Sequence, residues 1–221
     1  MTDDSFFREV NEEIRQDQAR ALWNRFGPVA IAIAVAVVLA TAAYVAYDYF
    51  RTSRANASGD RFSQALQLAE SGQHDAALTA LRSLQEDGFG AYPVLARMRE
   101  ASVLADGGDV SGAVAGFDAV AADASVPESL RDTARLRAAF LLVDHGSAAD
   151  VAARAEALAN ETSPFRHSAR EALGLAAWKE GRTDDALILF DQVLADEAAP
   201  SGVRERAELM AELIRGSGAA S

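Results

Sequence analysis

The sequence contains no cysteine and only three histidines. The absence of cysteine excludes disulfide bonds and thiolate chemistry, and it is compatible with either side of a bacterial inner membrane. His74, His145 and His167 lie far apart, without the HxxxH or HExxH spacing of a local zinc site. His145 precedes Gly146 at an expected helix end, where an imidazolium interacts favourably with the last carbonyl groups. We therefore expect no metal site.

Basic clusters and catalytic motifs are also missing. The 221 residues carry a net charge of −12, and no Lys/Arg cluster with interleaved aromatic residues occurs, which excludes a nucleic-acid-binding protein. There is no GxSxG, no GxxxxGK and no GxGxxG after a strand. Asp184 and Asp185 open an expected helix, where negative charge is stabilising without catalysis. We expect neither an enzyme nor a cofactor or small-molecule substrate.

One long apolar stretch, Val29 to Tyr47, holds no charged residue, and Thr41 is its only strongly polar one. At ~1.5 Å per residue this stretch reaches about 28 Å as a helix, close to the ~30 Å hydrocarbon core of a bilayer. It therefore predicts one membrane crossing. Aromatic residues gather at both ends, as expected at headgroup level: they are Trp23, Phe26, Tyr44, Tyr47, Tyr49 and Phe50.

A cleaved signal peptide is the alternative for this stretch, because Ala40-Thr41-Ala42 has the small-x-small pattern of a cleavage site. Signal peptides place an apolar core of ~7 to 15 residues behind a short basic leader. Here the leader covers residues 1–28 and is rich in carboxylates, so an uncleaved anchor fits better. Its orientation is undecided by charge, because Arg15, Arg20 and Arg25 before the stretch are matched by Arg51, Arg54 and Arg61 after it.

The segments on either side of the apolar stretch differ in character. Residues 4–26 predict a helix with an apolar stripe, which either lies on the membrane surface or docks on a partner's cytosolic loop. Residues 51–60 are polar and small, and we expect a short linker with a helix break at Ser58-Gly59. The stripe consists of Phe7, Val10, Ile14, Ala21, Leu22 and Phe26.

Regularly spaced glycines and prolines mark an internal repeat in the rest of the chain. Each glycine can end a helix in the left-handed conformation, and each proline can open the next one. Each period is thus a helical hairpin. The glycines are Gly72, Gly108, Gly146 and Gly181, at separations of 36, 38 and 35 residues, and the prolines are Pro93, Pro127, Pro164 and Pro200.

The hairpins resemble the tetratricopeptide repeat. That family places a small residue where the two helices of a pair touch, and here Ala65, Ala101, Ala139 and Gly174 stand seven residues before the glycines. The resemblance covers about residues 58–200, and residues 201–215 predict a helix that caps the stack. The copies are divergent, because their early aromatic residue is mostly missing and they exceed the usual ~34 residues.

The leader DSFFREVNEEIRQDQARALWNRFG, one apolar span and divergent repeats together resemble the YfgM-type family of bacterial inner-membrane proteins. Members of that family are ancillary partners of the SecYEG translocon. The resemblance implies a single-pass protein with a cytoplasmic N-terminus and a periplasmic repeat domain. It also implies that the domain passes emerging, unfolded proteins to periplasmic chaperones.

The expected organisation is all-α. It comprises a cytoplasmic amphipathic leader (1–28), a transmembrane helix (29–50), a linker (51–60) and a periplasmic domain of about four tetratricopeptide-like hairpins with a capping helix (61–221). We expect a membrane-anchored protein-interaction scaffold. The alternative is a structural periplasmic repeat protein that coordinates envelope or cell-division complexes and has no client groove.

The first helix of each hairpin should line the concave face, with side chains ten, six and three residues before each glycine. An apolar groove there could bind a partner's helix or extended segment. Alternatively, these side chains pack against one another or under the 201–215 helix. The apolar candidates are Phe62, Leu66, Met98, Leu136, Phe140, Leu175 and Trp178, with Ala69, Ser102, Ala105, Val143 and Glu171 at the remaining positions.

An uncleaved anchor predicts that the membrane fraction holds the full 23.4 kDa chain, including residues 1–25. Intact-mass spectrometry of the membrane-bound protein checks this. A soluble form that begins soon after Ala42 would contradict the anchor and favour the signal peptide.

Overall fold

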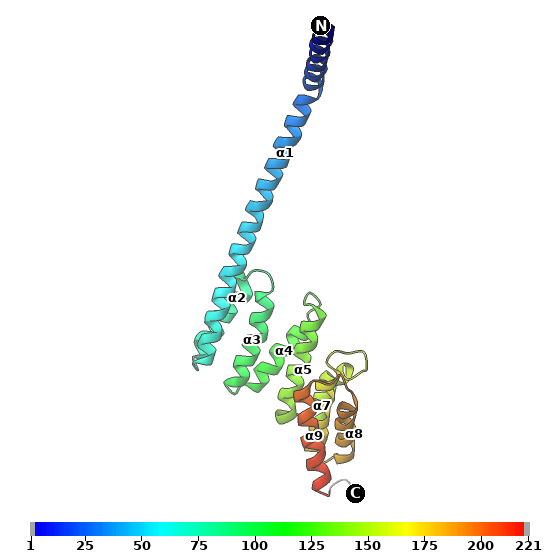
Figure 1. Ribbon diagram of the computed structural model, residues 1–221. Coiled ribbons are helices and arrows are strands. Elements are labelled where there is room, and N and C mark those ends of the chain that lie inside the picture. Colours follow the sequence, from blue (N-terminus) through cyan, green and yellow to red (C-terminus); the bar gives the residue numbers. More distant parts are fainter. Residues whose placement is uncertain (1–2, 219–221) are drawn as a thin grey trace. The chain divides into compact units, whose positions relative to one another are not determined.

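The computed structural model describes residues 3–218, with side chains described for 20–29 and 31–218. Every element in this part of the chain is a helix, which confirms the all-α prediction (Figure 1). The chain divides into two compact units, Met1–Asn56 and Ala57–Ser221. Each unit is considered by itself.

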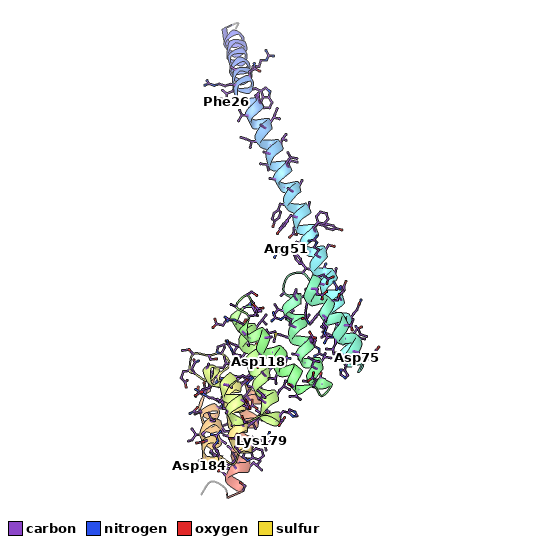
Figure 2. The ribbon with its side chains drawn as sticks, turned by 180° about the vertical axis from the view of Figure 1, so that it is seen from behind. Phe26, Arg51, Asp75, Asp118, Lys179 and Asp184 are labelled. Atoms are coloured by element: carbon purple, nitrogen blue, oxygen red, sulfur yellow. The ribbon has the colours of Figure 1, made fainter. Side chains whose placement is uncertain are left out.

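The first unit consists of a single helical segment, because α1 (Asp3–Glu70) begins there and passes Pro28 without interruption. Phe26 and Arg51 stand at the two ends of its apolar segment (Figure 2), where side chains are exposed all around the helix. The Thr41 hydroxyl donates to the Val37 carbonyl at 2.8 Å, so its polar group is satisfied within the helix. Among the described residues, α1 is the one helix long and apolar enough to cross a membrane.

The predicted helix over residues 4–26 is thus confirmed as part of α1, whereas Phe7, Val10 and Ile14 of its stripe lie outside the described side chains. The predicted break at Ser58-Gly59 is wrong, because α1 continues to Glu70.

Ser58 and Gly59 are small because another segment packs on them. The buried Ser58 hydroxyl accepts the Phe89 N–H at 3.0 Å. A Cβ atom on Gly59 would lie 2.7 Å from the Tyr92 hydroxyl. The small residues therefore allow a close approach to the loop before the next helix pair, and they do not end α1.

The second unit stacks four helical hairpins and one further helix (Figure 1), as predicted. The end of α1 pairs with α2 (His74–Asp87), and α3 (Tyr92–Asp106) pairs with α4 (Val110–Ala122). The third pair is α5 (Glu128–His145) with α6 (Ala148–Ala155), which ends in the 3₁₀ turn η1 (Glu156–Leu158). The fourth is α7 (Arg166–Lys179) with α8 (Thr183–Ala195), and α9 (Ser201–Gly216) follows.

Small residues line the contact inside each hairpin. Ala65, Ala101, Ala139 and Gly174 are all buried, as predicted. At Gly174 the approach is close, because an added Cβ atom would lie 2.9 Å from the Phe190 ring of α8. The backbones of paired helices therefore approach one another more closely than larger side chains would allow.

Three of the four hairpin turns use glycine in the left-handed region. The φ angles of Gly72, Gly108 and Gly181 are 77°, 89° and 77°. Gly146 differs, with φ −124°, and a capping box between Ser147 and Asp150 starts α6 instead. The third hairpin is also the most divergent in sequence, and its second helix is short.

Arginine–aspartate pairs join the two ends of three hairpins. Each connects an arginine of the hairpin's first helix to an aspartate at the end of its second helix or directly after it. The nitrogen–oxygen distances are 2.8 Å for Arg61–Asp87, 2.7 Å for Arg97–Asp123 and 2.7 Å for Arg166–Asp196. The partners are 26 to 30 residues apart, so helical periodicity does not predict the pairs.

The carboxylates that follow α4 and α8 are held in their charged form. Asp123 accepts the Ser125 hydroxyl, an Arg97 guanidinium nitrogen and the Ser125 N–H, which together lower its pKa from 3.8 to about 2. The His167 ring, the Ala198 N–H and Arg166 likewise hold the pKa of Asp196 well below its usual range.

The lowered pKa of Asp123 makes the stability of the hairpin stack pH-dependent. Its carboxylate stabilises the fold fully above about pH 4, and this contribution is lost as the pH falls toward about 2. Asp123→Asn should therefore lower the free energy of unfolding at pH 7, and the difference from wild type should shrink below pH 4. Urea unfolding of detergent-solubilised protein, followed by far-UV circular dichroism, measures both.

Glu208→Gln, at an exposed position of α9, is the matched control for this carboxylate change. A difference between Asp123→Asn and wild type that stays constant from pH 7 to pH 3 would contradict the assignment.

Candidate protein-binding groove

A groove of about 440 Å³ runs between the second and third hairpins, on residues of α3, α4 and α5. Its apolar part comes from two phenylalanines, one leucine and one alanine, and its polar part from arginines, carboxylates, a serine and a histidine. The lining residues are Arg99, Ser102, Ala105, Asp106, Phe117, Arg137, Phe140, Leu141, Asp144 and His145. The groove is therefore amphipathic, in contrast to the apolar groove expected from the sequence.

Arg137 connects the two sides of the groove. Its Nη1 donates to the Ser102 hydroxyl of α3 at 2.9 Å. Its guanidinium also lies over the Phe117 ring of α4, 6.0 Å from the centroid. Arg137 is exposed, and its hydrogen bond goes to a neutral hydroxyl rather than to a carboxylate. Its remaining N–H groups are thus available to an acceptor in the groove.

Arg99, on α3, is the least satisfied group of the groove. Its Nε atom is buried and has no hydrogen-bond acceptor among the described residues. Leaving a buried N–H of a charged group without an acceptor costs more free energy than a typical hydrogen bond contributes. A carbonyl or carboxylate oxygen of a bound polypeptide would remove this cost. The groove therefore combines an aromatic contact surface with basic hydrogen-bond donors.

The structure brings together only part of the predicted groove. Phe140 lines it together with Ser102 and Ala105. Met98 does not line the groove, because its side chain is 8% exposed and packs in the core with Phe117 of α4. This placement corrects the expectation that Met98 projects into the concave face: α4 and α5 cover it.

The other predicted residues lie elsewhere on the stack. Leu136 and Leu175 are half-buried against the core of α5, α6 and α7. Phe62 packs on the Tyr92 ring with centroids 5.9 Å apart, and Leu66 is half-buried. Ala69 and Val143 are buried.

At the fourth hairpin, α9 covers the predicted concave position. Glu171 of α7 is buried and accepts two hydrogen bonds from Arg206 of α9, one of them at 2.8 Å. Hydrogen bonding to Glu171 raises the pKa of Arg206. Trp178, two turns further along α7, remains 41% exposed. Glu171 therefore packs under α9, while Trp178 does not.

Sequence reasoning missed Arg99 and Arg137, because the groove was sought among apolar positions. A signal was present, since both arginines stand nine residues before the glycine of their hairpin. The histidines stay apart: His145 lines the groove, His167 bonds Asp196 at 2.8 Å, and His74 begins α2. Within the described part of the chain, no group of three or more His, Cys, Asp or Glu side chains could hold a metal ion.

Comparison with known families agrees with this architecture. The family described as tetratricopeptide repeat-like domain matches residues 20–209, which is most of the chain. The chain belongs to this family. The match begins before the apolar stretch of α1 and ends within α9, so the apolar helix and the hairpins are covered together. No curated protein and no solved structure gives a significant match.

The two hydrogen bonds between Arg206 and the buried Glu171 carboxylate predict strong coupling between these residues. Arg206→Met leaves the Glu171 carboxylate buried without its partner and should lower the free energy of unfolding by about 2 kcal/mol. This is below the ~3–5 kcal/mol of fully buried pairs, because the Arg206 side chain is 58% exposed. Urea unfolding of the single variants and of Glu171→Gln/Arg206→Met measures the coupling. Additive effects of the two substitutions would show that the pair does not hold α9 on α7.

Proposed function

We propose that this protein is a membrane-anchored scaffold whose groove over α3, α4 and α5 binds a segment of a partner protein. The buried Arg99 Nε without an acceptor, in a groove that also holds the half-buried Phe140 ring and the exposed Arg137, carries this proposal. Protein interaction is also the usual role of stacked tetratricopeptide hairpins, which present extended concave surfaces.

Three features of α1 support the membrane anchor. The stretch from Val29 to Tyr47 holds no charge, and its described side chains are exposed around the whole helix. The Thr41 hydroxyl has an acceptor within the helix, as a polar group in lipid requires. Aromatic side chains at both ends fit the two headgroup regions. In a bilayer this apolar surface is buried in lipid, whereas in water it would be a large aggregation-prone surface.

The location and partners follow from the resemblance of the leader to the YfgM-type family. On that basis the N-terminus is cytoplasmic, the span crosses the bacterial inner membrane once, and the hairpins are periplasmic. The proposed partners are the SecYEG translocon and periplasmic chaperones or unfolded clients. The residues of this chain that support the assignment are those of the segment DSFFREVNEEIRQDQARALWNRFG.

The anchor and the groove complement each other in this mechanism. A groove of about 440 Å³ accommodates a short segment of a partner, and such contacts are individually weak. An anchor in the same membrane as the partner raises the effective concentration of the groove and compensates for that weakness. Phe140 contacts an apolar side chain of the bound segment, while Arg99 and Arg137 donate hydrogen bonds to its oxygens.

A purely structural module without a client groove is the competing function. It gives no role to a groove in which Phe140 lies beside the donor groups of Arg99 and Arg137. For this reason we favour the scaffold.

Replacing the groove residues should abolish partner binding without unfolding the protein. With Phe140→Ser or Arg99→Met, we expect at least a tenfold decrease in the SecY, SecE and SecG subunits that co-purify in mild detergent. Ile188→Ser, which alters an exposed apolar residue of α8, should leave recovery unchanged. Quantitative mass spectrometry gives the recovery, and circular dichroism confirms that each variant is folded.

Two other outcomes separate the parts of the proposal. Unchanged recovery of the translocon subunits by folded groove variants would overturn the groove as their binding site. Absence of these subunits already in the wild type, with other partners lost on Phe140→Ser, would overturn the translocon assignment alone.

A further inference from the structure

The last helix, α9, lies where the first helix of a fifth hairpin would lie. Arg166 and Arg204, near the starts of α7 and α9, both bond Asp196 after the end of α8. Helices α7 and α9 therefore run in the same direction, both antiparallel to α8. Arg206 of α9 pairs with Glu171 of α7 at a separation of 35 residues, which is one repeat.

The same separation connects neighbouring first helices elsewhere in the stack. Arg137 of α5 bonds Ser102 of α3, and Lys179 of α7 bonds the Asp144 carbonyl of α5, in both cases 35 residues apart. Buried side chains repeat with this offset as well: Ala172 and Ala176 of α7 correspond to Ala207 and Ala211 of α9, and all four are buried. Helix α9 therefore packs on α7 in the register in which the first helix of a hairpin packs on the first helix of the preceding hairpin.

This register identifies a face of α9 that its own chain leaves uncovered. The small residue of each hairpin lies under the paired second helix, as Gly174 lies under Phe190 of α8. The corresponding position in α9, 35 residues later, is Leu209, which is 66% exposed. Leu213, one turn further on, is 50% exposed. No described helix packs on these two leucines.

Carboxylates border the two leucines on one side. Glu205, Glu208 and Glu212 are exposed on the same side of α9. The arginines of α9 point elsewhere, because Arg206 pairs with Glu171 and Arg215 pairs with Asp191 of α8 at 2.7 Å. The uncovered face is thus an apolar stripe bordered by negative charge.

We propose that this face docks a basic amphipathic helix of a protein partner, which takes the place of a paired second helix. The leucines match an apolar stripe at helical spacing, and Glu205, Glu208 and Glu212 match lysine or arginine side chains beside that stripe. A second copy of α9 fits poorly, because its own carboxylates would face these three. The surface is separate from the groove, so this proposal does not depend on the groove proposal.

A synthetic probe tests the docking face directly. The probe is a fluorescein-labelled helical peptide of about 18 residues, five turns long, with leucine on one face and lysine on the other. The full chain is held in nanodiscs of zwitterionic lipid, and fluorescence anisotropy gives the Kd. We expect Leu209→Ser/Leu213→Ser to raise the Kd at least tenfold, and Glu205→Lys/Glu212→Lys to do the same. Ile188→Ser should leave it unchanged, and binding should weaken with rising salt.

Further arms of the experiment identify the occupant. Phe140→Ser should leave the Kd of the probe unchanged, which separates this face from the groove. Equal affinity of the Leu209→Ser/Leu213→Ser variant, or of empty nanodiscs, would overturn the docking face. A wild-type dimer in sedimentation that Leu209→Ser/Leu213→Ser dissociates would also overturn the proposal, because a second copy would then occupy the face.

Discussion

The close approach of paired helices at small residues is the constraint on which the repeat unit depends. Ala65, Ala101, Ala139 and Gly174 are buried between the helices of their hairpins, and at Gly174 even one added carbon would meet the Phe190 ring. Backbones this close leave room for only a thin core, and α4 and α8 fill it with one phenylalanine each. A larger residue at any of these positions would separate the helices and shift every contact that the neighbouring hairpins make.

Polar contacts then position each hairpin on the next. Bonds at a separation of one repeat connect α3 with α5, α5 with α7 and α7 with α9, while arginine–aspartate pairs close individual hairpins. Most of these contacts lie near the surface and contribute little free energy, whereas the bond between Arg206 and the buried Glu171 carboxylate is the stronger one. Their effect is on geometry: they place Arg99, Arg137 and Phe140 around one groove, and they align α9 so that Leu209 remains exposed. Both proposed binding surfaces follow from the same repeat period.

Local sequence patterns predicted the parts of this fold that depend on short-range chemistry. Three local features predicted the hairpins: glycine in a left-handed turn, proline at a helix start and a small residue in every repeat. Each of them favours one local structure. The continuation of the helix through Ser58-Gly59 was missed, because small residues suggest a helix break when the residue that packs on them is 31 positions away in the sequence. The groove was predicted only at Phe140, Ser102 and Ala105. Arg99 and Arg137 were missed because the groove was sought among apolar positions, and the unsatisfied Nε atom of Arg99 becomes visible only once the surrounding side chains are placed.

The central claim is that the groove over α3, α4 and α5 is the surface that partners occupy at the membrane. Photo-crosslinking in intact cells tests it most directly, with a photoreactive amino acid at Ala105 inside the groove and at Ala115 on the exposed side of α4 as the control. The account predicts discrete crosslinked protein species from position 105 that are absent from position 115 and lost when Phe140→Ser is added. Equal crosslinking from both positions, or none from position 105 in the folded protein, would contradict it.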